Sequence, residues 1–109
     1  MLEAIVGSTS AERVLFFLVA RGEGYGTEIA RLFNTDLSPI QKQLERMERD
    51  GLLVNKQVGR TRVYSFNPRY PFCEELSAMI TKAIDLSPTK LREKLLLDRR
   101  RSRKKDKPL

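Results

Sequence analysis

The fold is decided between Thr27 and Phe66, where the chain reads TEIARLFNTDLSPIQKQLERMERDGLLVNKQVGRTRVYSF. In the first half of this stretch, apolar residues recur at helical spacing on either side of a short polar turn at Asn34. In the second half they alternate in two short segments around Gly59 and Arg60, as in a β-hairpin. The order of short helix, tight turn, helix and hairpin predicts a mainly α-helical fold with one small β-hairpin.

The longer of the two helices is expected to end at Asp50, with Gly51 as its left-handed cap. Two starts are compatible with the residues. Asp36 as N-cap would place Pro39 inside the first turn, whereas Ser38 as N-cap would place it at the first helical position. The apolar stripe that faces the core is expected to comprise Leu37, Ile40, Leu44 and Met47.

Upstream of this stretch, apolar residues at helical spacing predict a helix for which Ser8, Thr9 and Ser10 offer N-caps, and Thr9 with Glu12 fits a capping box. The glycine-rich segment after this helix is expected to form a loop. Thr27 can then cap the short helix. A brief helix at the start of the chain is expected to pack Ile5 and Val6 inward.

Beyond the hairpin, a helix is expected from Phe72 to about Leu86, and Ser87-Pro88 marks the start of another. The apolar stripe of the first of these helices is wider than a small three-helix core needs. We therefore expect it to form a dimer interface, made of Phe72, Leu76, Met79, Ile80 and Ala83. An intramolecular cover for the hairpin is the alternative interpretation.

The chain divides into three parts: residues 1–68 with the hairpin, residues 69–98 with the C-terminal helices, and a basic segment, 99–109, expected to be disordered. Its 109 residues, 40% of them hydrophobic, fit one compact domain. No apolar run approaches the roughly 20 residues that span a membrane, and no secretory leader is visible. The single cysteine, Cys73, excludes an intramolecular disulfide and suits a reducing compartment. We therefore expect a cytoplasmic protein.

The net charge is +7, and its distribution is more informative than its size. Residues 1–86 contain 11 Lys/Arg and 11 Asp/Glu, so the whole excess lies in residues 87–109. Within the neutral part, residues 38–69 carry seven basic and three acidic groups. The second helix and the hairpin therefore carry a local excess of positive charge within a part of the chain that is neutral overall. This excess favours a polyanionic partner such as nucleic acid.

Burial of the apolar stripe turns the opposite face of the second helix outward. Glutamine pairs bidentately with adenine, and arginine or lysine with guanine, in a major groove that admits one helix. The residues expected to read bases or hold the adjacent backbone are Ser38, Gln41, Lys42, Gln43 and Arg46. A solvated helix face, balanced by Glu45 and Glu48, is the alternative interpretation.

The hairpin carries Lys56, Arg60 and Arg62, and arginines at its tip suit contact with phosphates or the minor groove. The alternative use, a charged edge that prevents strands from aggregating, is compatible with the first. Thr27 can donate its hydroxyl to a phosphate, although such a threonine more often only caps its helix.

These features together resemble the ArsR/MarR-type winged helix-turn-helix regulators over about residues 8–68. The residues that carry the resemblance are Ile29, Ala30, Leu37, Ile40, Leu44, Met47, Asp50, Gly51, Leu52, Leu53, Gly59, Arg60 and Tyr64. It implies that the helix starting near residues 36–38 is the recognition helix, with Ser38, Gln41, Lys42 and Arg46 at or beside the bases. It also implies that Arg60 and Arg62 lie on the wing.

Two departures limit what this resemblance carries over. The metal sensors among ArsR-type regulators use cysteine and histidine ligands, whereas this chain has one cysteine and no histidine. We therefore expect no soft-metal site and no cofactor. The turn has Asn34-Thr35 where relatives often have Gly-Leu.

The lack of histidine also excludes Ser–His and Cys–His nucleophilic chemistry, so we expect no enzyme.

The sequence thus predicts a winged helix-turn-helix protein, with added C-terminal helices, that binds double-stranded DNA as a homodimeric transcriptional regulator. Two recognition helices would then enter successive major grooves. The alternative is a winged-helix interaction or assembly module whose basic tail contacts nucleic acid without sequence preference. Neither function calls for a metal or a membrane.

Overall fold

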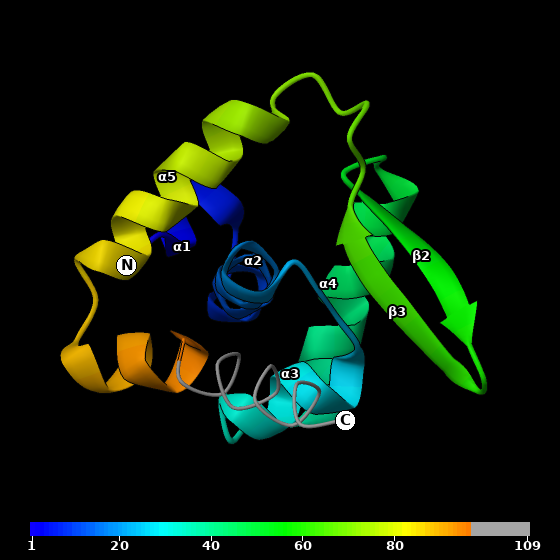
Figure 1. The fold of residues 1–109 in the computed structure, drawn as a ribbon, viewed down its shortest axis with the longest axis horizontal. Coiled ribbons are helices and arrows are strands. Elements are labelled where there is room, and N and C mark those ends of the chain that lie inside the picture. The colour runs from blue at the N-terminus through cyan, green and yellow to red at the C-terminus, as the bar shows by residue number, and fades with distance from the viewer. Residues whose placement is uncertain (97–109) are drawn as a thin grey trace, which may run out of the picture.

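The computed structural model describes residues 1–96 of the chain. Its elements are α1 (Glu3–Val6), α2 (Thr9–Arg21), β1 (Glu23–Gly24), α3 (Gly26–Leu32), α4 (Leu37–Arg49), β2 (Leu53–Val58), β3 (Thr61–Phe66) and α5 (Cys73–Asp85). A last helical segment covers residues 89–96 (Figure 1). The segment 99–109, with the disorder expected for it, lies outside the described residues. No helix within residues 1–96 is long and apolar enough to cross a bilayer.

Helix α2 is the centre of the molecule, and the other helices and the sheet surround it (Figure 1). Most of its side chains are buried in one continuous apolar core. Its N-cap is Ser8, whose hydroxyl accepts a hydrogen bond from the Ala11 amide at 3.1 Å. The expected capping box of Thr9 and Glu12 is therefore wrong, and the Glu12 carboxylate instead accepts from the amide of Leu2.

The tight turn and α4 form as the local sequence predicts. Asn34 adopts a left-handed φ of 52°, and α4 starts after Asp36, one of the two N-caps left open. Gly51 follows the helix with a φ of 87°. The Leu52 amide then donates to the Met47 carbonyl at 2.9 Å, which completes the cap.

Two expectations about the starts of these helices are wrong. Tyr25, and not Thr27, is the N-cap of α3, so Thr27 is an exposed residue of the first turn. Leu37 was expected on the buried stripe of α4, but it is exposed. Its side chain lies beside Gly26, at the corner between α3 and α4, instead of in the core.

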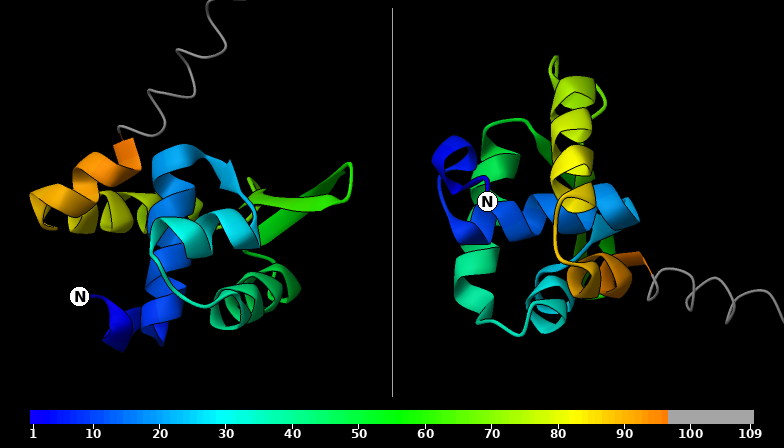
Figure 2. Two further views of the ribbon diagram at one scale, coloured as in Figure 1. Left: turned by 90° about the horizontal axis from the view of Figure 1, so that it is seen from below. Right: turned by 90° about the vertical axis from the view of Figure 1, so that its left-hand side faces the viewer.

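The hairpin forms as predicted from β2 and β3, with Val58 opposite Thr61 at its tip, and it projects from the helical body (Figure 2). The glycine-rich segment is not only a loop, because β1 pairs antiparallel with β3 and gives the strand order β1-β3-β2. A Cβ atom on Gly24 of β1 would lie 2.4 Å from a ring carbon of Phe17 in α2. Strand β1 therefore attaches the base of the hairpin closely to the central helix.

Helix α5 packs on α2 and extends the same core. Ile80 and Ala83, which the sequence assigned to a dimer interface, are only 0% and 3% exposed and belong to the protein's own core. These two residues are thus buried within the single chain, on a helix that packs on α2. Phe72 is exposed, and Leu76 and Met79 are half-buried.

The two ends of the described chain also pack on this core. In α1, Val6 packs inward as expected, but Ile5 is exposed, because so short a helix buries only one side. The last helical segment buries Leu95, and Arg21 of α2 donates hydrogen bonds to the carbonyls of Lys94 and Leu95 at 3.3 and 3.2 Å.

Candidate nucleic-acid interface

Helix α4 presents one polar face to solvent beside the hairpin. Ser38, Lys42 and Arg49 are exposed on this face. The side buried against the rest of the protein consists of Ile40, Leu44 and Met47. The helical period thus separates core and surface on α4 as the sequence predicts, and it leaves the polar face open to a large partner.

Three of the expected base-reading side chains are engaged with neighbours in the free protein. Arg46 donates from Nε and Nη2 to Oε1 of Gln43, at 2.9 and 2.8 Å. Gln41 donates from Nε2 to the Tyr64 hydroxyl at 3.4 Å and to the Glu45 carboxylate at 3.3 Å. These contacts have to be exchanged before Gln41, Gln43 or Arg46 can hydrogen-bond to a base.

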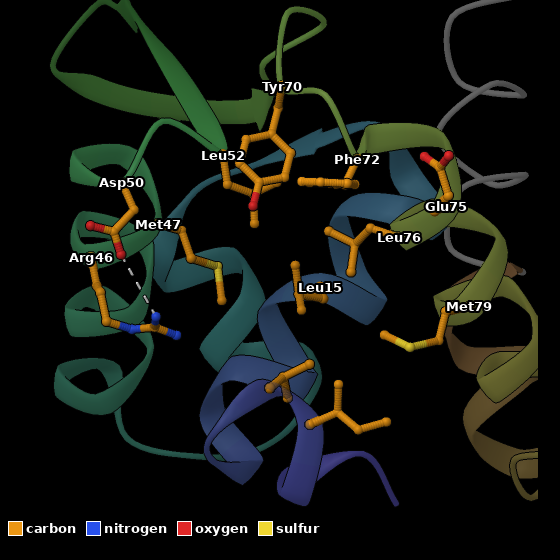
Figure 3. A pocket seen from close by; sticks show the side chains of 12 residues that line it. Leu15, Arg46, Met47, Asp50, Leu52, Tyr70, Phe72, Glu75, Leu76 and Met79 are labelled. Atoms are coloured by element: carbon orange, nitrogen blue, oxygen red, sulfur yellow. Dashed lines mark ion pairs between the residues drawn. The ribbon is translucent and has the colours of Figure 1, made fainter.

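Arg46 also contacts residues outside the expected DNA-binding set. Its Nη1 atom is 3.9 Å from the Asp50 carboxylate, and its side chain lines an apolar pocket between α4 and α5 (Figure 3). Lys42, one turn earlier on α4, makes no hydrogen bond or ion pair with the residues that the structure describes. Lys42 is therefore available to a partner without the loss of an existing contact.

The starts of α3 and α4 meet the hairpin at an open depression of about 200 Å³. Its lining residues are Tyr25, Gly26, Thr27, Leu37, Gln41, Arg60, Thr61 and Arg62. Four of the residues singled out from the sequence, Thr27, Gln41, Arg60 and Arg62, are thus brought together. Hydroxyl groups and two guanidinium groups around one depression suit a phosphate of a nucleic-acid backbone.

Tyr64 connects the hairpin to α4, a role that the sequence analysis did not assign to it. Its side chain is fully buried, and its hydroxyl accepts the hydrogen bond from Gln41. A hydrogen bond with Tyr64 also raises the pKa of the Arg62 guanidinium, which stays cationic beside the depression. In the sequence Tyr64 is one of the alternating apolar residues of a strand, so no local signal indicates where its hydroxyl lies.

The remaining hairpin cations differ in their surroundings. Lys56 on β2 places its Nζ 3.4 Å from the Glu23 carboxylate on β1, and both side chains are largely exposed, so this ion pair stabilises the fold little. Arg60, at the tip, is exposed and makes no hydrogen bond or ion pair within residues 1–96. Arg60 is thus the hairpin cation that is readiest to meet a phosphate.

A metal site is not evident in the part of the chain that the structure describes. No group of three or more His, Cys, Asp or Glu side chains there is placed to hold a metal ion. Cys73 is a free, half-buried thiol at the start of α5.

No protein-family model and no curated protein sequence matches the chain, but solved structures do. The antimony-specific transcriptional repressor AntR superposes with a TM-score of 0.61 at 18% identity, over 78% of this chain and 72% of that one. The adhesin competence repressor AdcR from Streptococcus pyogenes gives a TM-score of 0.55 at 13% identity, over 84% and 78%. A probable transcriptional regulator from Pseudomonas aeruginosa gives 0.54 at 21% identity, over 90% and 83%.

These structures are two repressors and a probable regulator, and none is described as an enzyme. At such low identity the likeness concerns the fold, and it agrees with the fold expected from the resemblance to ArsR/MarR-type regulators. Helices α3 and α4, followed by the hairpin of β2 and β3, have the element order of a winged helix-turn-helix. The chain therefore has a winged helix-turn-helix fold, in which α3 and α4 form the helix-turn-helix and β2 and β3 form the wing.

Proposed function

We propose that this protein is a transcriptional regulator that binds double-stranded DNA with a preference for certain sequences. The observation that carries the proposal is the exposed polar face of α4 beside a wing whose tip bears Arg60. A major groove about 12 Å wide accepts one α-helix. With α4 in that groove, the wing reaches the adjacent backbone.

Base contacts are assigned first to Lys42 and Ser38, because both are exposed and have no partner to give up among residues 1–96. Lysine donates to the acceptors on guanine, and serine can hydrogen-bond to several bases. The three engaged side chains, Gln41, Gln43 and Arg46, would contribute only after exchanging their present contacts for contacts with DNA.

Backbone contacts are assigned to Thr27, Arg60 and Arg62, which surround the depression between α3, α4 and the wing. Contacts of this kind set the register of the protein on the duplex and carry no sequence information of their own. They would therefore contribute affinity for every sequence, whereas the α4 contacts would distinguish between sequences.

The functional form is a homodimer in this proposal. A single recognition helix contacts few base pairs, whereas two that are related by a two-fold axis read half-sites about 34–36 Å apart. Support for self-association comes from Phe72, which is exposed beside the half-buried Leu76 and Met79. In this proposal the regulator acts on DNA in the cytoplasm.

Selection of double-stranded sites from a randomised pool tests this function directly. The purified protein is expected to enrich one pseudo-palindromic sequence. Lys42→Ala should reduce the discrimination between that sequence and a scrambled one by about 1–3 kcal/mol. Lys82→Ala, which removes an exposed lysine on α5, is the matched control and should behave like the parent protein. No enrichment, or equal losses in the two variants, contradicts the proposal.

A second candidate function is an interaction or assembly module that contacts nucleic acid through its tail alone. The charge distribution favours it, because the net positive charge of the chain lies in residues 87–109. A chain ending at Leu96 keeps Leu95 in the core and keeps its contact with Arg21, so the fold should survive the truncation. Complete loss of DNA binding in this folded, shortened protein, with no sequence preference in the parent, would favour the module.

A further inference from the structure

One large aliphatic side chain lies on the open side of α4 beside the wing. Leu37 is the first residue of α4 and is 43% exposed, although the apolar spacing of the helix predicted its burial. It lines the depression between α3, α4 and the wing, together with Thr27, Arg60 and Arg62. An apolar side chain is therefore in contact with water at the place to which the phosphate contacts are assigned.

The position of Leu37 is set by the start of α3. A Cβ atom on Gly26 would lie 3.0 Å from Cδ1 of Leu37, so the missing side chain at Gly26 leaves space for the leucine. The same Cβ atom would collide with the amide oxygen of Gln41, one turn later on α4. Gln41 is in turn hydrogen-bonded to the buried Tyr64. Leu37 thus rests against a packed corner, with part of its surface open toward the depression.

The major groove of DNA offers an apolar group on one of its four bases, the 5-methyl group of thymine. In helix-turn-helix complexes, the N-terminal residues of the recognition helix contact the base edges. With α4 in the groove as proposed, Leu37 lies among the residues that reach the bases, directly before Ser38. Arg60 and Arg62 line the same depression and attract phosphates, so the surroundings of Leu37 favour a duplex over an apolar protein surface.

We propose that Leu37 contacts the 5-methyl group of one thymine in each DNA half-site. This inference rests on the sequence-specific DNA binding proposed above and deepens it. Removal of one methyl group from water increases affinity about fourfold. Lys42 and Ser38 recognise their base pairs through hydrogen bonds in this scheme, whereas Leu37 recognises a T·A pair through its methyl group alone.

Replacement of single thymines by deoxyuridine, in the site selected from the randomised pool, tests the contact. Deoxyuridine lacks the methyl group and keeps every hydrogen-bonding group of the base. At one thymine of the half-site, this replacement should weaken binding of the full-length parent about fourfold, as measured by fluorescence anisotropy. Leu37→Ala removes the partner of the methyl group, so this variant should no longer distinguish thymine from deoxyuridine there.

Leu96→Ala is the matched control. Leu96 is 45% exposed, close to the value for Leu37, but it belongs to the last helical segment, away from the wing (Figure 1). This variant should prefer thymine over deoxyuridine as strongly as the parent does. Leu37→Met keeps an apolar side chain of similar reach and should retain most of the preference. Each variant is compared with itself on two duplexes, so a change in overall affinity cancels from the ratio.

The two possible failures are distinguishable. If no sequence is enriched from the pool, the regulator function is contradicted, and the role of Leu37 with it. If a sequence is enriched but no thymine in it distinguishes Leu37→Ala from Leu96→Ala, only the role of Leu37 is overturned. Loss of the preference in Leu37→Met as complete as in Leu37→Ala would equally contradict an apolar contact with the methyl group.

Discussion

The Tyr64 hydroxyl lies where the wing meets α4, with Gln41 and Arg62 as its partners. Tyr64→Phe keeps the ring in the core and removes these hydrogen bonds. We expect the free energy of unfolding to fall by about 0.5–1.5 kcal/mol, the usual net contribution of a hydrogen bond. Urea unfolding measures the change. The Tyr70 hydroxyl makes no hydrogen bond within residues 1–96, so Tyr70→Phe is the control, and equal losses in both variants would argue against this role of Tyr64.

Glu28 in α3 gives the stability of the protein a specific dependence on pH. Burial raises the pKa of this carboxyl above its model-compound value of 4.5, although a hydrogen bond to the Tyr25 backbone partly opposes the shift. The folded protein therefore binds this proton more tightly than the unfolded chain, and stability falls as the pH rises from the unfolded pKa through the folded one.

Glu28→Gln removes this titration and leaves a neutral side chain of similar shape. The variant should be more stable than the parent at pH 7, where the parent's carboxylate is charged and partly desolvated. The advantage should shrink at about pH 4, where the parent is largely protonated. Urea midpoints at the two pH values test this, and an advantage of the same size at both would show that burial of the charge is not its cause.

At the scale of elements, those with strong local signals could be predicted from the sequence. Asn34 and Gly51 mark the turn and the end of α4, because few other residues adopt positive φ at low cost. The period of α4 likewise separates its core side from its polar face. Strand β1 could not be predicted, because two residues have no periodicity and their pairing depends on β3. The contacts of Arg46 with Gln43, and of Tyr64 with α4, also require the tertiary structure.

Strand β1 gives a stability prediction of its own. Gly24→Ala would place a Cβ atom 2.4 Å from the Phe17 ring, so the strand or the ring has to move. We expect a loss of about 1–3 kcal/mol, as for other overpacked positions, measured by urea unfolding. Glu23→Ala, at the neighbouring residue, loses only an exposed ion pair and should cost much less. An unaffected Gly24→Ala variant would mean that β1 does not pack on α2 as described.

At the scale of the whole molecule, charge should govern affinity more than specificity. With about three to four phosphate contacts in each protomer, log affinity for DNA should fall with log salt concentration with a slope of roughly −6. Arg60→Ala should make this slope shallower by about one and weaken all sequences alike. Fluorescence anisotropy across a series of KCl concentrations gives these slopes, and a slope near zero would contradict the scheme.

The same titration separates the tail from the folded part of the protein. Residues 97–109 carry seven Lys/Arg and two Asp/Glu, so their removal should lower the affinity for any duplex. The ratio of affinities for the selected and scrambled sites should stay close to that of the parent, because the base contacts assigned to α4 are retained. A ratio that falls to one in the shortened chain would place sequence recognition in the tail.

The pairing of β1 with β3 has a mechanical consequence. The wing is braced at its root, since it cannot swing relative to α2 without breaking the strand pairing at Gly24 and Tyr64. A spin label on Ser65 should therefore show the slow rotational motion of the whole protein, without faster local motion of the strand. In the proposed complex, a wing held at its root would leave more of any adjustment of shape to the DNA.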